Sequence, residues 1–211
     1  MLGLTLIVEP ICRDEFLSMV IHRKTVRRYH EPGDLHLFTF NCYQKLALLT
    51  DPRVLCNLSH RIDKALRLHN CKLIAFVYMP DHVHMLVLPS SPTFESELFL
   101  KSFKQPLSRF VHRLWATEDN PALPRLMVQY PDRSQTFRFW QQGGGHDRNI
   151  RGERRILNAI HYIHRNPVRR GLALTPMEWK WSSARFYREE PERPIDPDLP
   201  EVYWPTADLF D

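Results

Sequence analysis

The chain has 211 residues, of which 43% are hydrophobic and 25% are charged, as expected for a globular protein with one domain of ordinary size. Seven glycines against 17 prolines exclude collagen-like repeats and flexible low-complexity sequence as the main content. The longest apolar stretch, residues 73–79, is too short to cross a bilayer, and no basic residue precedes the apolar run 2–8. We therefore predict a cytoplasmic protein with no membrane partner.

The charge is distributed unevenly along the chain. The formal net charge is +5, but residues 1–188 carry 28 basic against 16 acidic residues, whereas residues 189–211 carry eight acids and one Arg. A basic body with an acidic tail indicates a polyanionic partner, most simply nucleic acid, and hence a nucleoid-associated location. The alternative interpretation, a basic surface that binds no partner, is also compatible with the charge alone.

Between residues 36 and 88 the pattern predicts a strand, a helix and a pair of strands, in that order. Asp51 followed by Pro52 is typical of a helix N-cap with proline in the first turn, and apolar residues keep helical spacing to about Asn70. Residues 72–79 are apolar on both faces, which suits a central strand, and residues 82–88 resume a strand after a two-residue break. Strands joined so tightly are expected to form an antiparallel hairpin.

The second half predicts two helices separated by irregular sequence. We expect a helix at 93–115 despite Pro106, a loop at 119–132, and a strand-like segment at 136–141 that ends at three glycines. Another helix is predicted at 151–165, ended by Asn166-Pro167 because a residue before proline avoids the helical region. The aromatic segment 178–187 should pack on the body, and the chain from residue 191 should be an irregular tail with few long-range contacts.

His82-Val83-His84 is the first motif that carries chemistry. Residues i and i+2 of a strand point to the same face about 7 Å apart, so two imidazoles can converge on one divalent metal ion while Val83 points into the core. The spacing alone is a weak signal, because either histidine could be an ordinary surface residue.

Tyr162 is the second motif, because it does not lie on the apolar face of its predicted helix. That face holds Ile156, Leu157, Ile160 and Ile163, and Tyr162 lies roughly 150° from its centre. With Asn166 one turn further on, a phenol oxygen and an amide oxygen could reach the same metal ion. A tyrosine packed on a second element would show the same pattern.

Basic residues suited to phosphate contacts surround these motifs, and Trp140 offers a ring for stacking on unpaired bases. The predicted DNA-binding residues are Arg27, Arg28, Lys101, Lys104, Trp140, Arg148, Arg151, Arg155, Arg165 and Arg169. A metal that polarises a phosphate and a tyrosine oxygen that attacks it would together cut DNA and keep the bond energy in a phosphotyrosine.

Four segments, in order and spacing, resemble the REP-associated tyrosine transposases, a group of the HUH (His-hydrophobic-His) single-strand endonucleases. They are YMPDHVHMLV, FWQQGGGHDRNI, AIHYIHRNPVRRGL and EWKWSSARFY. The resemblance implies an α+β fold with a ferredoxin-like antiparallel sheet flanked by helices, His82 and His84 as metal ligands, Asn166 as third ligand and Tyr162 as nucleophile. It also implies Mg²⁺ or Mn²⁺ as cofactor, and single-stranded or hairpin DNA as partner of a monomer or homodimer.

On this resemblance the catalytic domain covers residues 27–188, between an N-terminal arm at 1–26 and an acidic, proline-rich tail at 189–211. Met19 could be the true start, which would make residues 1–18 an upstream extension. Two alternatives stay open beside the nicking and rejoining enzyme. One is a domesticated transposase that binds hairpin DNA without catalysis. The other is a metal-dependent hydrolase, for which Asp81 is the nearest candidate base, although it should point to the strand face opposite His82.

Overall fold

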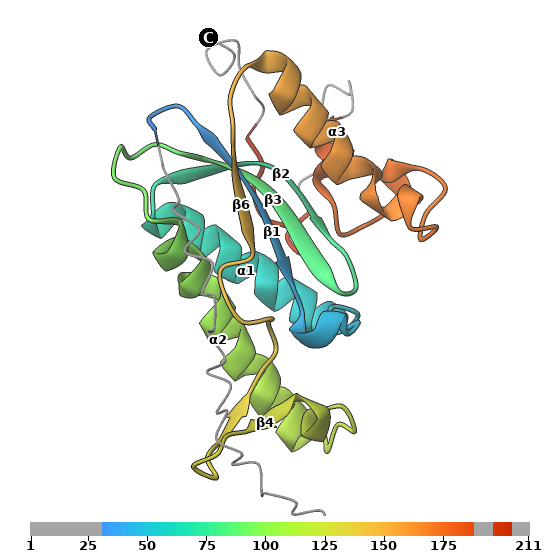
Figure 1. Ribbon diagram of the computed structural model, residues 1–211. Helices are drawn as coiled ribbons and strands as arrows, with labels where there is room; N and C mark the ends of the chain where they lie inside the picture. Colours follow the sequence, from blue (N-terminus) through green and yellow to red (C-terminus); the bar gives the residue numbers. More distant parts are fainter. Residues whose placement is uncertain (1–30, 188–195, 204–211) are drawn as a thin grey trace, which may run out of the picture.

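The computed structural model describes residues 31–187 and 196–203, so the predicted arm with Arg27 and Arg28 lies outside the described residues (Figure 1). The helices are α1 (Pro52–Leu68), α2 (Ser96–Thr117) and α3 (Glu153–Arg169). The strands are β1 (Leu35–Asn41), β2 (Cys71–Tyr78), β3 (His82–Pro89), β4 (Met127–Gln129), β5 (Gln135–Phe137) and β6 (His146–Ile150). Short 3-10 helices occupy Tyr43–Lys45, Leu123–Leu126, Pro176–Glu178 and Ser183–Tyr187.

Four strands form one antiparallel sheet in the order β2-β3-β1-β6. The strand β3 lies between β1 and β2, which are joined through α1, and β6 returns after α2 to pair with the free side of β1. This is the ferredoxin-like arrangement, so the expected α+β fold is confirmed. The predicted hairpin of β2 and β3 is also confirmed, with Tyr78 opposite Val83.

The two faces of the sheet bury separate apolar cores. Side chains such as Phe38, Phe40 and Val83 face α1 and α2, whereas Leu35, Val77 and Leu86 face the apolar stripe of α3. In Figure 1, α1 and α2 lie together on one side of the sheet and α3 lies on the other. Because side chains alternate along a strand, the residues next to Val83 point toward α3. In the described residues, no helix is long and apolar enough to cross a membrane.

Three sequence predictions for the second half of the chain were wrong. The segment His146–Ile150, for which no strand was predicted, forms β6. Its polar sequence has no strand pattern, and the strand forms because its backbone pairs with β1. The predicted loop 119–132 contains a 3-10 helix and β4. Helix α3 does not end at Asn166-Pro167 but continues to Arg169, and it stops before Gly171, whose φ of 68° is the left-handed conformation typical of a helix end.

The C-terminal part of the chain covers the exposed edge of β2. The hydroxyl of Tyr187 donates to the carbonyl of Ile74, and the backbone N–H of Tyr78 donates to the carbonyl of Trp181, so the predicted packing of segment 178–187 is confirmed. The tail prediction was wrong for residues 196–203, because Leu199 is buried and the N–H of Tyr203 donates to the carbonyl of Leu73. Covering an edge strand in this way blocks its pairing with other chains.

Gly145 lets the glycine-rich loop, residues 143–145, lie close against the backbone of β1. Its replacement should therefore destabilise the fold. A Cβ at this position would lie 2.2 Å from the carbonyl oxygen of Thr39, and the φ of 72° disfavours any other residue. We expect Gly145→Ala to lower the free energy of unfolding by roughly 2 kcal/mol or more, as measured by urea denaturation. Gly143→Ala is the matched control, because its Cβ would meet no atom within 4 Å and only the strain of its positive φ, about 1 kcal/mol, remains. Equal losses in the two variants would contradict the prediction.

Candidate active site

The site lies where the α3-facing side of the sheet changes from apolar to polar. Toward one end this face presents Leu35 and Leu86 to α3, and toward the other end it presents Thr39, His82 and His84. Antiparallel pairing sets Thr39 opposite His84 and Asn41 opposite His82. The polar side chains of two neighbouring strands therefore converge at one end of α3.

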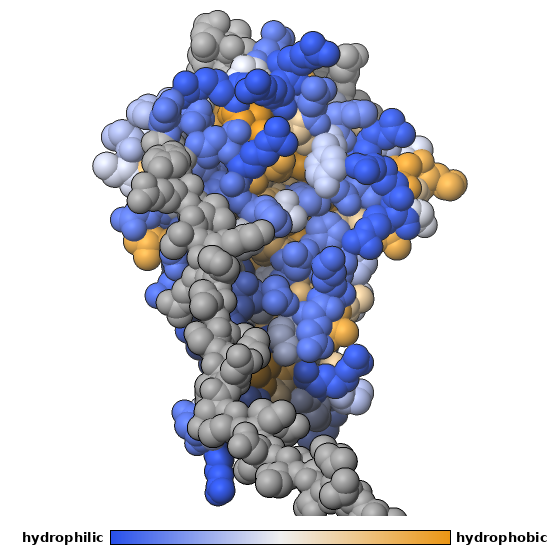
Figure 2. All heavy atoms as spheres, in the orientation of Figure 1, coloured by the Kyte–Doolittle hydropathy of each residue, from blue (hydrophilic) through white to orange (hydrophobic). Residues whose placement is uncertain are grey.

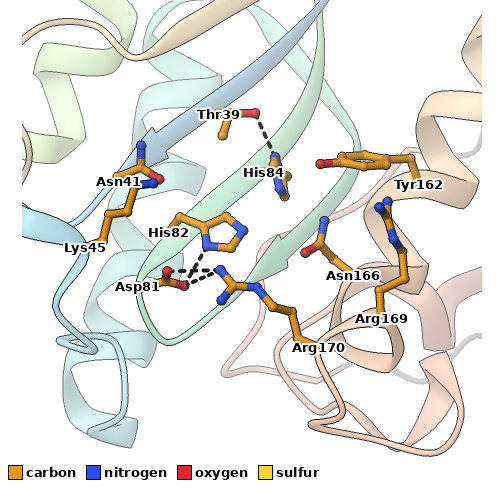
Figure 3. A pocket seen from close by; sticks show the side chains of 10 residues that line it. All are labelled: Thr39, Asn41, Lys45, Asp81, His82, His84, Tyr162, Asn166, Arg169 and Arg170. Carbon is orange, nitrogen blue, oxygen red and sulfur yellow. Dashed lines mark hydrogen bonds and ion pairs between the residues drawn. The ribbon is translucent and has the colours of Figure 1, made fainter.

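The two histidines point into a common pocket, and each is held by its Nδ1 atom (Figure 3). Their ring centroids are 4.8 Å apart. Nδ1 of His84 is 2.7 Å from Oγ1 of Thr39, and Nδ1 of His82 is 2.6 Å from Oδ1 of Asp81. Hydrogen bonds at Nδ1 leave Nε2 of each ring for the pocket, which is the arrangement that orients a metal-binding imidazole.

His84 is suited to metal binding by its protonation state as well as by its orientation. The pKa of His84 is lowered to about 3, chiefly by burial and also by the neighbouring His82 and Arg170, against the opposing effect of Asp81. Only the neutral imidazole has a lone pair for a metal ion. At neutral pH, therefore, His84 needs no proton release before it can act as a ligand.

Asp81 lies in the pocket, and the expectation that it would point to the opposite strand face was wrong. It belongs to the turn before β3 rather than to the strand, so strand alternation does not apply to it. Its carboxylate bonds Nδ1 of His82 and forms an ion pair with Nη2 of Arg170 at 3.0 Å. Burial alone would raise the pKa of Asp81, but these two partners outweigh burial and hold it below its usual value.

Tyr162 and Asn166 reach the pocket from α3, on the stripe opposite its apolar face. The Tyr162 ring lies 5.2 Å from the His84 ring, and Figure 3 shows its hydroxyl directed toward His84. Asn166, one helical turn later, is 7% exposed and directs its amide into the same space, whereas Tyr162 is 40% exposed. The guanidinium of Arg169 lies 5.4 Å from the centroid of the Tyr162 ring. A large polar substrate can therefore approach the tyrosine oxygen from outside.

The opposite wall of the pocket contains residues that the sequence patterns did not single out. Asn41 and Lys45 line the pocket of about 330 Å³ across from Tyr162 (Figure 3). Gln44 and Lys45 have φ values of 52° and 56°, which residues other than glycine rarely adopt. Such strain is often stored at functional sites, but no periodic pattern reveals it in a sequence.

The donor atoms in this pocket fit a divalent metal ion. In residues 31–187 and 196–203, no three His, Cys, Asp or Glu side chains converge as a metal-binding group. His82 and His84 nevertheless offer two Nε2 atoms, and Asn166 supplies an amide oxygen on the same pocket. These three ligands would leave coordination positions for a phosphate oxygen and water.

The predicted DNA-binding residues do not form one cluster. Arg169 lines the pocket described above, Arg148 and Arg155 line an adjoining pocket, and Lys101, Lys104 and Trp140 line a third between α2 and the glycine-rich loop. Arg165 is exposed on α3. Arg151 instead forms ion pairs with Glu31 and Asp34, so its charge is largely neutralised within the protein.

A ferredoxin-like sheet whose central strand carries a histidine pair facing a helix-borne tyrosine is the arrangement implied by the resemblance to HUH transposases. The family model described as "Transposase IS200 like" matches residues 34–122, the part of the chain that contains the histidine pair. This match confirms the resemblance to transposases of the IS200 type. None of the curated protein sequences matches this chain.

Solved structures similar to the chain include the following two. One is of the REP-associated tyrosine transposase bound to a REP hairpin, with 24% identity and a TM-score of 0.55 over 75% of this chain and 81% of that chain. The other is of a Deinococcus radiodurans R1 protein provisionally assigned as a transposase, with 21% identity and a TM-score of 0.38 over 65% of this chain and 92% of that chain. The first likeness supports the fold described above.

Proposed function

We propose that this protein is a metal-dependent single-stranded DNA endonuclease and transposase, with residues 27–188 as its catalytic domain. It would nick and rejoin hairpin-forming DNA through a covalent 5′-phosphotyrosine. The observation that carries the proposal is the meeting of the Tyr162 hydroxyl, the histidine pair and the Asn166 amide in one open pocket. The fold shared with a transposase that is bound to a REP hairpin supports hairpin DNA as the ligand.

The pocket supplies positive charge around the position of a scissile phosphate. Arg169 and Lys45 line it on opposite walls, and neither forms an ion pair within the described residues. A Mg²⁺ or Mn²⁺ ion held by His82, His84 and Asn166 would polarise a phosphate oxygen. The side chains around it hold the phosphodiester so that its phosphorus faces the Tyr162 oxygen.

The chemical step exchanges one phosphorus–oxygen bond for another. The Tyr162 oxygen loses its proton and attacks the phosphorus, the bond from phosphorus to the 3′ oxygen breaks, and that oxygen leaves as a 3′-hydroxyl after taking up a proton. Because the new phosphodiester retains the energy of the old one, a 3′-hydroxyl can later attack it and release the tyrosine. Rejoining therefore needs no nucleotide cofactor.

Lys45 is expected to assist the departure of the 3′ oxygen. In an in-line displacement the leaving oxygen lies opposite the attacking one, and Lys45 lies across the pocket from Tyr162. We expect Lys45→Met to slow adduct formation by about 10²-fold, the usual contribution of one electrostatic contact to the transition state. Lys64→Met, at an exposed position of α1, is the control. An unchanged single-turnover rate in Lys45→Met would remove Lys45 from the mechanism.

The proposal is tested with a hairpin oligonucleotide that has single-stranded flanks, incubated with the protein and Mg²⁺ or Mn²⁺. A denaturation-resistant protein–DNA product, with mass spectrometry placing the phosphate on Tyr162, is the expected result. Binding without cleavage on a panel of hairpins would favour the non-catalytic alternative. Cleavage without adduct would favour water as nucleophile, although Asp81 is a poor base while its carboxylate is bonded to His82 and Arg170.

A further inference from the structure

A second pocket adjoins the proposed active site, and Tyr162 lines both. It lies between β6 and α3 and has a volume of about 570 Å³, within the range of sites that hold small organic groups. In Figure 2, hydrophobic surface is visible between hydrophilic side chains in the region where Figure 1 shows β6 beside α3. No step of the proposed cleavage uses this pocket.

The lining of this pocket combines apolar side chains with positive charge. Leu37, Ile150 and Ala159 supply apolar atoms, and Arg148 and Arg155 supply two guanidinium groups. Neither arginine forms an ion pair within the described residues, in contrast to Arg151 between them in sequence. A purely apolar ligand would give the two guanidinium groups no anionic partner. A nucleotide, in contrast, offers an aromatic base to the apolar side chains and phosphates to the arginines.

Helix α3 places a second asparagine symmetrically to the first. Asn158, Tyr162 and Asn166 follow one another at intervals of four residues and so lie on one stripe of the helix. Asn166 lines the metal-binding pocket and Asn158 lines the second pocket. His146, at the start of β6, lines the second pocket from the sheet side and offers a ring for stacking.

We propose that this second pocket binds the nucleobase on the 3′ side of the scissile phosphate, and that Asn158 reads the edge of that base. This inference rests on the proposed function. In-line displacement directs the 3′ oxygen of the upstream nucleotide away from Tyr162 and toward Lys45, so the upstream base lies on that side. The downstream nucleotide stays attached to the phosphorus beside Tyr162, where the second pocket opens. An asparagine amide both donates and accepts hydrogen bonds, and it therefore discriminates between base edges.

The test uses hairpin oligonucleotides whose single-stranded flank carries each of the four bases, or an abasic site, at successive positions. Adduct formation with Mn²⁺ and the Kd in EDTA are measured for the parent protein, Asn158→Ala and Leu157→Ala. Leu157 serves as the control: contrary to its predicted place on the apolar face of the helix, it is an exposed residue of α3, and it lies outside both pockets. With the parent, an abasic site just 3′ of the cleaved bond should weaken binding and slow cleavage by about 5- to 150-fold.

Asn158→Ala should reduce the differences in Kd and in cleavage rate between substrates that carry different bases at that position. On the abasic substrate, Asn158→Ala and the parent should bind and cleave equally well. Equal cleavage of intact and abasic substrates by the parent would overturn the inference, as would an Asn158→Ala defect of the same size on both substrates. The EDTA binding data separate this inference from the proposed function. If no adduct forms but one flank position still shows the abasic defect and its dependence on Asn158, the base pocket stands and the phosphotyrosine mechanism fails.

Discussion

Tyr162→Phe is expected to lower covalent adduct formation by at least about 10⁴-fold, because the substitution removes the attacking oxygen and nothing else. In the described part of the chain the Tyr162 hydroxyl makes no hydrogen bond, and its ring contacts with His84 and Arg169 are retained by phenylalanine. The free energy of unfolding should therefore change by less than about 0.5 kcal/mol. Hairpin binding should persist, since the basic side chains are untouched. Single-turnover cleavage with gel analysis under denaturing conditions measures the effect.

Tyr203→Phe is the matched control for this substitution. Both tyrosines are 40% exposed, but Tyr203 lies beside the edge of β2, with its N–H bonded to the carbonyl of Leu73. The control should form adduct at the parent rate. If Tyr162→Phe instead cleaved at the parent rate, water or another residue would be the nucleophile, and the phosphotyrosine mechanism would have to be abandoned.

The sequence predicted those parts of the site that depend on short-range periodicity. The alternation of His82, Val83 and His84 requires only that the segment be a strand, and the position of Tyr162 opposite the apolar stripe requires only that its segment be a helix. Both conditions are local and both are met. The roles of these residues in metal binding and catalysis stay predictions.

The parts that were not predicted depend on long-range pairing or on exceptions to local rules. Thr39 meets His84 only because β1 and β3 pair in one particular register, which no segment of sequence specifies alone. Pro167 lies within the last turn of α3, where a proline removes one backbone hydrogen bond and fixes a φ that the helix already has. The sequence rule ended the helix there, and so it missed that Arg169 is part of the same helix as Tyr162.

The charges of residues 31–187 show why composition indicated nucleic acid without locating the contact surface. Arg151 is paired with acids, whereas Arg148 and Arg155 are not, although all three are exposed and close in sequence. A net charge counts them equally. Only the unpaired arginines can exchange counterions for phosphates, so they should account for more of the salt dependence of DNA binding than Arg151.

His84→Gln is expected to lower adduct formation by about 10³-fold, since removal of one metal ligand weakens the Lewis acid that polarises the phosphate. Glutamine roughly preserves the volume of the buried imidazole, so the fold should survive, which circular dichroism can check. The remaining ligands His82 and Asn166 still offer a weak site. Adduct formation by His84→Gln should therefore rise with Mn²⁺ concentration well beyond the level that saturates the parent, whereas Tyr162→Phe should not respond. His60→Ala, at an exposed position of α1, is the control.

Thr39→Val is a milder perturbation of the same predicted metal ligand, His84. Valine keeps the β-branched shape that suits a strand but removes the hydroxyl 2.7 Å from Nδ1 of His84, so the imidazole loses the partner that orients it. Loss of such an orienting partner typically costs 10–100-fold in metal affinity or activity, so we expect Thr39→Val to slow adduct formation by a factor in this range. Restoring the rate of Thr39→Val should take a lower Mn²⁺ concentration than restoring that of His84→Gln. If Thr39→Val and His84→Gln were both insensitive to Mn²⁺, the histidine would act in DNA binding or packing rather than on a metal ion. His84→Gln removes the imidazole itself, whereas Thr39→Val removes only the hydroxyl that orients it. The order of the two Mn²⁺ requirements therefore tests whether His84 is a metal ligand.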